Sequence, residues 1–568
     1  MWVQKRLGVI SLALAIGVVA CAPPPSPTAS QRAGAEPPKP AGVARITAAI
    51  LGDPAALVPE LNGFGIRGVD AIEDLTRVGL TTFNDQGRPV VRLAEAIPSL
   101  ENGNWVVFPD GRMETTWKIR EGARWHDGTP FTSSDLVFTA RVGQDRELPE
   151  FGHTAYASIE SVDEIDPRTV VVKWRQPYID ADLVFARGLA APLPKHLLES
   201  ALAENPAGFT QLPYWNEGYV SSGPFRVREL VRSSHVLLEA FDGYVLGRPK
   251  LDEIELRFIP DGPTLMANLL AGSVELTLGI NISLDQGIEV RDQWSAGTMG
   301  LGLSNAQSVY IQFLNPSPPV IANVEFRRAV YHAINRQELA DTLMAGQSPV
   351  AHTFMFANQP QYREIEAALP RYDYDPRRGT QLIEGLGYTR ASDGLFIDGA
   401  GRQLTVELRT YAGTVNEKAS LAVADYWQRA GVKTDVSVTS PQLARNNEYV
   451  FTYPGFVLQR YTSDVRLLQN LYSSRAPTPE NGFRAGNISR YQNPEFDALL
   501  DRYFTTIPLP QRIQVLGQIL YHVADQVTQM PLVYDVEPTM IGNRLVNVAA
   551  RNIPSSTQAW NSHEWAVK

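Results

Sequence analysis

The side chains that could carry out chemistry are few and scattered in this chain. It has one cysteine, Cys21, and eight histidines that form no cluster in the sequence. The patterns Gly-x-Ser-x-Gly and His-Glu-x-x-His, which mark serine hydrolases and zinc peptidases, are absent. Acidic residues are abundant, so a carboxylate pair at glycosidase spacing is the catalytic arrangement that stays open. A hydrolase acting on glycans or peptides is therefore the alternative class, and we predict no catalytic residue, metal ligand or cofactor.

Cys21 ends an apolar N-terminal segment. Lys5 and Arg6 precede an apolar run over residues 7–20, which is too short to span a bilayer and suits the core of a secretory signal. Small residues stand directly before Cys21, which resembles the lipobox of bacterial lipoproteins. We therefore expect residues 1–20 to be a lipoprotein signal peptide and Cys21 to carry the lipid. With one cysteine, no internal disulfide bond can form.

A proline-rich segment follows the cysteine. Residues 22–40 contain seven prolines among Ser, Ala and Gly, a composition that buries too little apolar surface to fold. We expect residues 21–42 to be an extended tether that leaves the folded part free to reorient above a membrane. The net charge of the chain is −10, which gives no electrostatic support for a nucleic-acid partner.

One stretch predicts a complete strand, turn and helix. Residues 113–120 alternate between apolar and polar side chains, which indicates a half-buried strand. Asp127-Gly128 can form a tight turn, because glycine accepts positive φ at no steric cost. Thr132 and Asp135 are spaced to cap a helix reciprocally, and apolar residues continue at helical spacing after them. These patterns alone predict structure and no function.

Taken whole, residues 116–138 (TWKIREGARWHDGTPFTSSDLVF) closely resemble the hallmark segment of the solute-binding proteins of peptide-type ABC importers. This is the oligopeptide, dipeptide and nickel-binding family, bacterial extracellular solute-binding protein family 5. Shorter segments follow in the order of that family, and the resemblance spans about residue 44 to the C-terminus. They are Leu193–Leu198, Ser222–Val227, Leu270–Leu276, Phe326–Arg336, Tyr491–Leu500 and Met530–Val533.

The resemblance implies an α/β fold with two lobes, a ligand cleft between them and an additional inserted β-rich domain. An independent sign of an α/β fold is a strand around 404–408, a helix over 419–430 and a strand over 432–438, which together predict a parallel βαβ unit. By matching segments, lobe one takes 43–80, 186–305 and 528–568, the inserted domain 81–185, and lobe two 306–527. We assign the hallmark segment to the structure of the inserted domain and not to ligand contact.

The resemblance also implies where a ligand is held. In peptide-binding relatives, an aspartate shortly after a Gly-Trp pair binds the α-ammonium of the peptide. Here Phe456 stands in place of that tryptophan and Gln459 in place of the aspartate, whereas Asp464 is near enough to substitute if the loop shifts. A neutral amide compensates a buried ammonium less well than a carboxylate does. The ligand therefore stays open between a peptide and a sugar, an opine-like compound or another neutral solute.

Five further residues are candidates for the cleft. Asn62 and Phe64 belong to a Gly-rich loop, and Tyr156, Tyr411 and Tyr453 have rings that suit an adaptable apolar pocket. Core packing is the alternative for each ring. The Gly-rich loop formally matches the Gly-x-Gly-x-x-Gly dinucleotide motif, but it does not open directly from a strand, so we reject that function.

We therefore predict an extracytoplasmic binding protein rather than an enzyme. The expected partners are an oligopeptide or other small solute, an ABC-transporter permease and the lipid anchor at Cys21, and the expected state is a monomer. The anchor would hold the protein at the bacterial cell membrane, on the periplasmic side or at a Gram-positive surface.

Overall fold

The computed structural model describes residues 42–568 except 63–66, 188–190, 280, 463–464 and 554. The chain divides into two units, Met1–Gly42 and Val43–Lys568, and the following concerns the second. The predicted signal peptide, Cys21 and nearly all of the tether lie outside the described residues. Among the residues described, no helix is long and apolar enough to cross a membrane.

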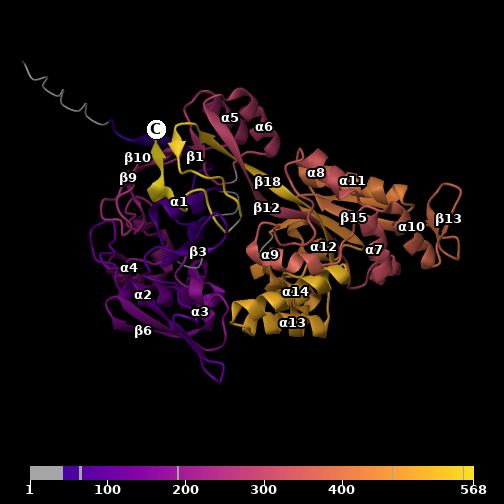
Figure 1. Ribbon diagram of the computed structural model, residues 1–568, viewed down its shortest axis with the longest axis horizontal. Helices are drawn as coiled ribbons and strands as arrows, with labels where there is room; N and C mark the ends of the chain where they lie inside the picture. Colours follow the sequence, from indigo (N-terminus) through magenta and orange to yellow (C-terminus); the bar gives the residue numbers. More distant parts are fainter. Residues whose placement is uncertain (1–41, 63–66, 188–190, 280, 463–464, 554) are drawn as a thin grey trace, which may run out of the picture. The chain divides into compact units, whose positions relative to one another are not determined.

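A mixed sheet of ten strands organises the second unit (Figure 1). Its two longest strands pair antiparallel at the centre and continue from one half of the sheet into the other. We call the half around β1 lobe one and the half around β15 lobe two. The order is β16 (Lys433–Thr439), β15 (Thr405–Tyr411), β17 (Phe456–Thr462), β12 (Gly297–Ile311), β18 (Gln529–Gly542), β11 (Leu276–Thr277), β1 (Arg45–Leu51), β10 (Glu253–Ile259), β9 (His235–Ala240) and β8 (Phe225–Val231).

Lobe one is built on strands that run parallel to β1. Strands β10 and β11 pair with β1 on either side. Helix α1 (Val69–Thr76) belongs to the main apolar core of this lobe, whereas α5 (Gly262–Leu270) and α6 (Leu284–Gln293) enclose a separate, smaller core. Gly68 precedes α1 with φ +96°, and a Cβ there would lie 2.5 Å from Ile50 and 2.8 Å from the Leu278 carbonyl oxygen. Only glycine fits this close approach.

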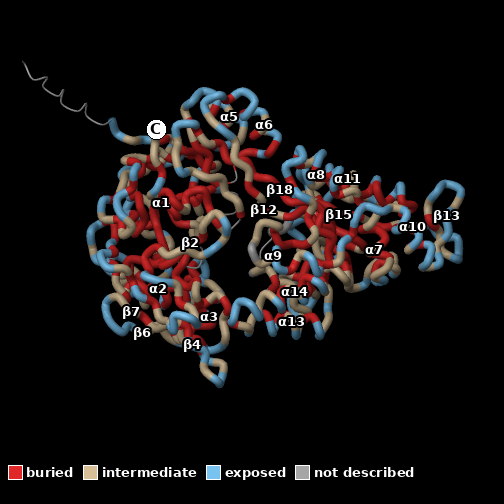
Figure 2. The backbone as a smooth tube through the Cα atoms, viewed as in Figure 1, coloured by how far each residue is buried: buried red, intermediate tan, exposed pale blue. Residues whose placement is uncertain are grey.

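Lobe two confirms the predicted βαβ unit. Strands β15 and β16 pair parallel and are joined by α11 (Thr414–Arg429). The core beside this unit also takes side chains from α7 (Val324–His332), α8 (Arg336–Leu343) and α10 (Pro376–Gly385). Helices α13 (Pro494–Thr505) and α14 (Leu509–Asp525) pack on each other and belong to a different core. Figure 2 shows the buried residues concentrated along the sheet and beneath these helices.

A separate antiparallel sheet of four strands lies within the predicted inserted domain. Its order is β4 (Trp105–Val107), β5 (Met113–Lys118), β7 (Thr169–Trp174) and β6 (Ile159–Asp166), and it is covered by α2 (Ser133–Gln144). The predicted strand, turn and helix are all present: Gly128 has φ +88°, and the Thr132 N–H donates to the Asp135 carboxylate at 2.9 Å. Asp135 also accepts hydrogen bonds from the Trp125 indole and the Lys195 N–H, at 3.2 and 3.0 Å. The polar side chains of the hallmark segment thus form hydrogen bonds within the protein. The predicted domain boundaries themselves stay a prediction.

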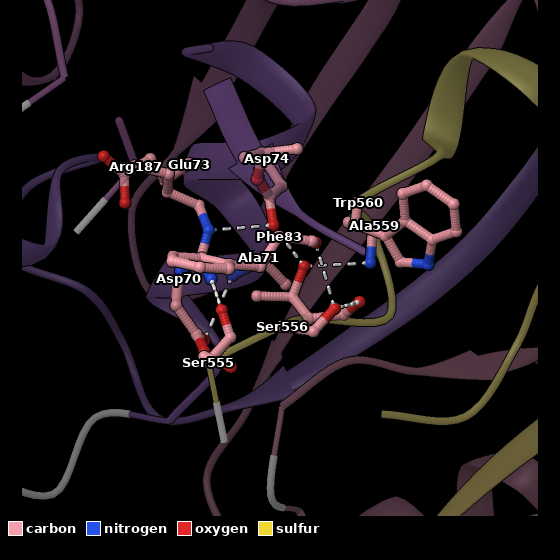
Figure 3. A network of polar contacts seen from close by, with 12 residues as sticks. Asp70, Ala71, Glu73, Asp74, Phe83, Arg187, Ser555, Ser556, Ala559 and Trp560 are labelled. Atoms are coloured by element: carbon pink, nitrogen blue, oxygen red, sulfur yellow. Dashed lines mark hydrogen bonds and ion pairs between the residues drawn. The ribbon is translucent and has the colours of Figure 1, made fainter. Parts of the chain in front are cut away.

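A buried ionic network ties α1 to distant segments, and we call Glu60, Glu73, Asp74, Arg77 and Arg187 the α1 cluster. Arg77 Nη2 lies 2.5 Å from both Glu60 Oε1 and Glu73 Oε1. Asp74 faces Arg187 Nε at 3.2 Å (Figure 3). It also accepts hydrogen bonds from the hydroxyls of Thr82 and Thr557. The network therefore connects α1 with the C-terminal segment of the chain.

A candidate ligand site between the two lobes

A cavity of about 420 Å³ has walls from both lobes. Its volume falls within the range of small-molecule sites, about 300–1,000 Å³. The strands that join the lobes form its floor. Lobe one contributes Arg67 and Asn281–Asp285; lobe two contributes Leu343, Met344, Ala412, Gly413, Val415 and Asn416; the central strands contribute Gln307, Arg460 and Asp535–Glu537.

The cavity lies where parallel strands end and helices begin. Residues 281–285 follow β11 and enter α6, and residues 412–416 follow β15 and enter α11. In open α/β sheets, ligands bind beside these carboxyl ends of the strands. Each helix already has an acid in its first turn, Asp285 in α6 and Glu417 in α11, and Glu417 accepts a hydrogen bond from the Gly413 N–H at 3.0 Å. Residues of the protein itself therefore stabilise the starts of these two helices, and no ligand is needed for that.

Two carboxylates on β18 lie at the floor of the cavity. Asp535 and Glu537 are two residues apart, so both project from the same face of the strand, and each is 7% exposed. Asp535 accepts a hydrogen bond from Gln307 Nε2 at 3.1 Å and lies 2.5 Å from Arg460 Nε. Glu537 Oε1 is 3.7 Å from Arg460 Nη2, beyond hydrogen-bonding distance. We call Asp535, Glu537 and Arg460 the cavity cluster.

The cavity cluster contains two buried acids and one arginine. Burial raises the pKa of Asp535, against the lowering effect of Arg460 and the Gln307 hydrogen bond. Burial likewise raises the pKa of Glu537, against the charge of Arg551, which itself lies 3.4 Å from Asp70. Both acids therefore pay a cost for being ionised at neutral pH that a further positive charge would reduce.

A bulge in β12 positions the cavity cluster. The pairing with β18 shifts between Leu303, opposite Val536, and Ala306, opposite Tyr534. Two residues of β12, Ser304 and Asn305, therefore oppose the single residue Asp535, and such bulges re-aim the side chains around them. Sequence reasoning missed both acids. They could have been recognised in the sequence, because they stand two positions apart in a mostly apolar stretch that begins at Leu532.

Four residues predicted for the ligand are held by contacts within the protein. The Asn62 amide nitrogen donates to the carbonyl oxygens of Ala56 and Val58, each at 2.7 Å, and so holds its own loop. Tyr156 and Phe456 are fully buried in two apolar cores. Tyr453 is equally buried, and its hydroxyl donates to the Ile488 carbonyl oxygen at 2.9 Å. In this structure none of the four lines the cavity.

Tyr411 and Gln459 are half-buried and lie next in sequence to cavity-lining residues, Ala412 and Arg460. Alternate residues of a strand face opposite sides of the sheet. Gln459 therefore faces the side of Val457, which packs with Tyr411 and Tyr453, whereas Arg460 faces the cavity. Phe64 and Asp464 lie outside the described residues, as does Cys21. The assignment of these side chains to a ligand site stays a prediction.

Comparison with known proteins identifies the family. The model of the family described as bacterial extracellular solute-binding proteins, family 5 Middle, matches residues 95–481. The chain belongs to this family. The match confirms the resemblance drawn from residues 116–138, and the family consists of solute-binding proteins, not enzymes.

Relatives of this family-5 chain are remote in sequence. An ABC transporter peptide-binding protein of Brucella melitensis is 29% identical over 287 residues, which cover 50% of this chain and 51% of the relative, so the chain aligns with about half the length of such relatives. The oligopeptide-binding protein AppA of Bacillus subtilis is 24% identical over 435 residues, covering 76% of this chain and 75% of that one.

Solved structures confirm the two-lobed α/β fold. The structure of Bacillus subtilis AppA in complex with a nonapeptide aligns over 92% of this chain and 99% of that one, with a TM-score of 0.65 and 19% identity. The substrate-binding protein CtaP of Listeria monocytogenes aligns over 92% and 99%, with a TM-score of 0.73 and 20% identity. At these identities the likeness concerns the fold.

Proposed function

We propose that this family-5 protein captures a peptide or similar small solute between its two lobes and delivers it to the permease of an ABC importer. The observation that supports the proposal best is the cavity of about 420 Å³, which has walls from both lobes and lies at the carboxyl ends of their parallel strands. The peptide-binding descriptions of its relatives support the choice of solute class.

Binding would work through motion of the lobes about strands β12 and β18. In two-lobed proteins, closure around a ligand needs only small changes in the segments that cross between lobes. Closure would bring the start of α6 toward the end of α8 and the start of α11, which form opposite walls of the cavity. Ligand contacts from the loops of Phe64 and Asp464 remain part of this proposal, whereas Tyr411 and Gln459 lie on the side of the sheet opposite to the cavity.

The proposal is tested by identifying what the protein holds. Protein purified from its own host without unfolding should release a bound solute on denaturation, detectable by mass spectrometry. Adding that solute back should raise the melting temperature, since a ligand at a hundred times its Kd stabilises the native state by about 2.7 kcal/mol. The solute should be recovered chemically unchanged. Chemical conversion of the solute by the protein would contradict the proposal.

We further propose that Cys21 anchors the protein to a membrane on the outer side of the cell, with residues 21–42 as tether. The support is the apolar segment before Cys21 and the proline content after it. Wild type should incorporate labelled lipid in a bacterial host, and Cys21→Ser should abolish labelling and release the chain from membranes or leave it unprocessed. Unlabelled wild type would contradict the anchor and leave solute binding unaffected.

A further inference from the structure

We propose that Asp535 and Glu537 receive a cationic group of the ligand, an ammonium or a guanidinium, and that Arg460 occupies this place until the ligand arrives. The inference rests on the proposed function and specifies the chemistry of its solute. It concerns the face of the sheet opposite to Gln459, so it does not depend on the position at which family relatives have their aspartate.

The first argument is the balance of charge in the cavity. Its lining includes three acids, Asp285, Asp535 and Glu537, against two arginines, Arg67 and Arg460. Asp285 and Arg67 are exposed and lie in loop and helix-start positions, whereas Asp535 and Glu537 are each 7% exposed. Asp535 and Glu537 are therefore the buried charges at the floor of the cavity, where water screens them least, and the arginines that compensate them are Arg460 and, for Glu537, Arg551.

The second argument is an acceptor that the described protein leaves unused. Gln307 is 1% exposed and lines the cavity, and its Nε2 donates to Asp535. No described residue donates a hydrogen bond to its Oε1, whereas the Ser304 hydroxyl lies close enough to Glu537 to lower the pKa of that carboxyl. Buried acceptors are nearly always satisfied in native proteins, so an unused one in a ligand-sized cavity indicates a missing donor. Ammonium and guanidinium groups are donors that carry positive charge.

The third argument is that Arg460 can leave. Its side chain is 37% exposed, and it engages Asp535 through Nε while Nη2 stays 3.7 Å from Glu537. The Asn305 amide oxygen also accepts hydrogen bonds from Arg460 Nε and Nη2, at 3.0 and 3.2 Å, so departure of Arg460 breaks these contacts as well. An arginine that lies at the border of solvent keeps its charge hydrated when it swings out. A ligand cation can then bridge both acids, which Arg460 does not do here. Arg460 is thus an internal competitor for the site.

Three amidated probes of one length test the inference, so that no probe has a carboxylate to engage the arginines. They are trialanine amide with a free ammonium, acetylated trialanine amide without charge, and acetylated Ala-Arg-Ala amide. The full-length chain, in detergent, is dialysed against their equimolar mixture, and the bound probes are quantified by mass spectrometry after denaturation. The proteins compared are wild type, Asp535→Asn/Glu537→Gln, Arg460→Met and the control Asp110→Asn, which removes an exposed acid that does not line the cavity.

Wild type should hold at least one cationic probe about tenfold or more over the neutral one, the preference expected of a charged hydrogen bond. Asp535→Asn/Glu537→Gln should lose the preference and keep its binding of the neutral probe. Arg460→Met should bind the cationic probe several-fold more tightly, a gain that a purely structural arginine would not produce. Asp110→Asn should change the preference less than about twofold.

Three results overturn the inference: no cationic preference in wild type, a preference that survives in the double variant, or weaker cation binding in Arg460→Met. Binding of the neutral probe without preference removes only the inference and leaves solute binding intact. Absence of binding to every probe counts against both. If the double variant does not fold, the single variants Asp535→Asn and Glu537→Gln carry the same test, and each should lower the preference.

Discussion

The α1 cluster and the cavity cluster both bury acids around an arginine, but they differ in how deeply that arginine is buried and how many acids it contacts. In the α1 cluster, Arg77 is 1% exposed and contacts Glu60 and Glu73 at 2.5 Å. In the cavity cluster, Arg460 is 37% exposed and contacts one of two acids closely. The α1 cluster is buried except for Glu60, whose side chain is 17% exposed, and the cavity cluster borders the cavity.

This difference separates a structural role from a binding role. The charge of Arg77 is disfavoured by burial, but Glu60 and Glu73 outweigh that effect and raise its pKa. Burial raises the pKa of Glu73 to about 7, although Arg77 lowers it. Such a group is costly to disturb, because removing one member leaves the others buried without compensation. The cavity cluster can exchange its cation through the cavity.

The largest effect should come from Arg77→Met. This change leaves Glu60 and Glu73 without their cation, so we expect the free energy of unfolding to fall by about 3–5 kcal/mol. Chemical denaturation monitored by circular dichroism measures it. Arg226→Met is the matched control, since Arg226 is an exposed arginine that pairs with Glu239, and it should cost about 1 kcal/mol or less. Equal losses in the two variants would show that the buried Arg77 stabilises the fold no more than an exposed arginine does.

The next effect concerns His126, which adjoins the α1 cluster. Its Nε2 donates to the Gly223 carbonyl oxygen at 3.0 Å, and the Gly223 N–H donates to Thr76 of α1. Burial lowers the pKa of His126 to about 4, against the hydrogen bond to Gly223. Between pH 6.5 and 4 the unfolded chain then binds the extra proton, so the folded state loses stability as the pH falls, by about 3 kcal/mol in all.

The variant His126→Gln tests this loss of stability. It should be less stable than wild type at pH 7 by about 1–2 kcal/mol, because a buried hydrogen bond is disturbed. The difference in stability between variant and wild type should be smaller by about 2 kcal/mol at pH 5. At this pH wild type has lost stability through His126, whereas the variant has no histidine at that position. His352 and His563 contribute equally to both proteins, so the difference isolates His126. A constant gap between pH 7 and 5 would contradict the lowered pKa.

A smaller change in stability is expected when one aspartate in each cluster is replaced by asparagine. Asp535→Asn removes an acid whose pKa is raised by burial, so stability at pH 7 should change by at most about 1 kcal/mol and in the favourable direction. Asp74→Asn breaks the pair with Arg187 and should cost at least about 2 kcal/mol.

The pH dependence of stability gives a further test of Asp535→Asn. A raised folded-state pKa means that wild type gains stability as the pH falls toward the ordinary value of 3.8, and the gain is complete below that value, where Asp535 is protonated in both states. The advantage of Asp535→Asn over wild type should therefore shrink as the pH is lowered from 7 to 4. Thermal unfolding of both proteins across this range measures it. An advantage that grows toward acid pH would refute the assignment.

The smallest effect should come from Gln459→Asp. The change adds a carboxylate on the face of β17 opposite to Arg460, so the preference for a free-amine peptide over its acetylated form should move less than about twofold. Calorimetry with one matched peptide pair measures it. A gain of tenfold or more would show that position 459 anchors the ligand, as the resemblance implies, and that the cavity cluster does not.

The sequence alone determined the family and the local elements of this protein. Residues 116–138 were sufficient because a strand, a turn and a capped helix depend on neighbours within a few positions, and the Thr132–Asp135 pair and the β15–α11–β16 unit formed as their spacing predicts. The replacement of the expected aspartate by Gln459 was equally visible, since it is a matter of residue type at an aligned position.

Only the tertiary structure decided which side chains meet. Tyr156, Tyr453 and Phe456 suited a pocket by type, yet they fill cores, because the burial of a ring depends on what packs over it. Of the 61 acidic residues, Asp535 and Glu537 stand out only once β18 pairs with β12 across a bulge and the ends of β11, β15 and β17 converge on one cavity. Those partners are hundreds of residues apart, and the order of strands in the sheet brings them together.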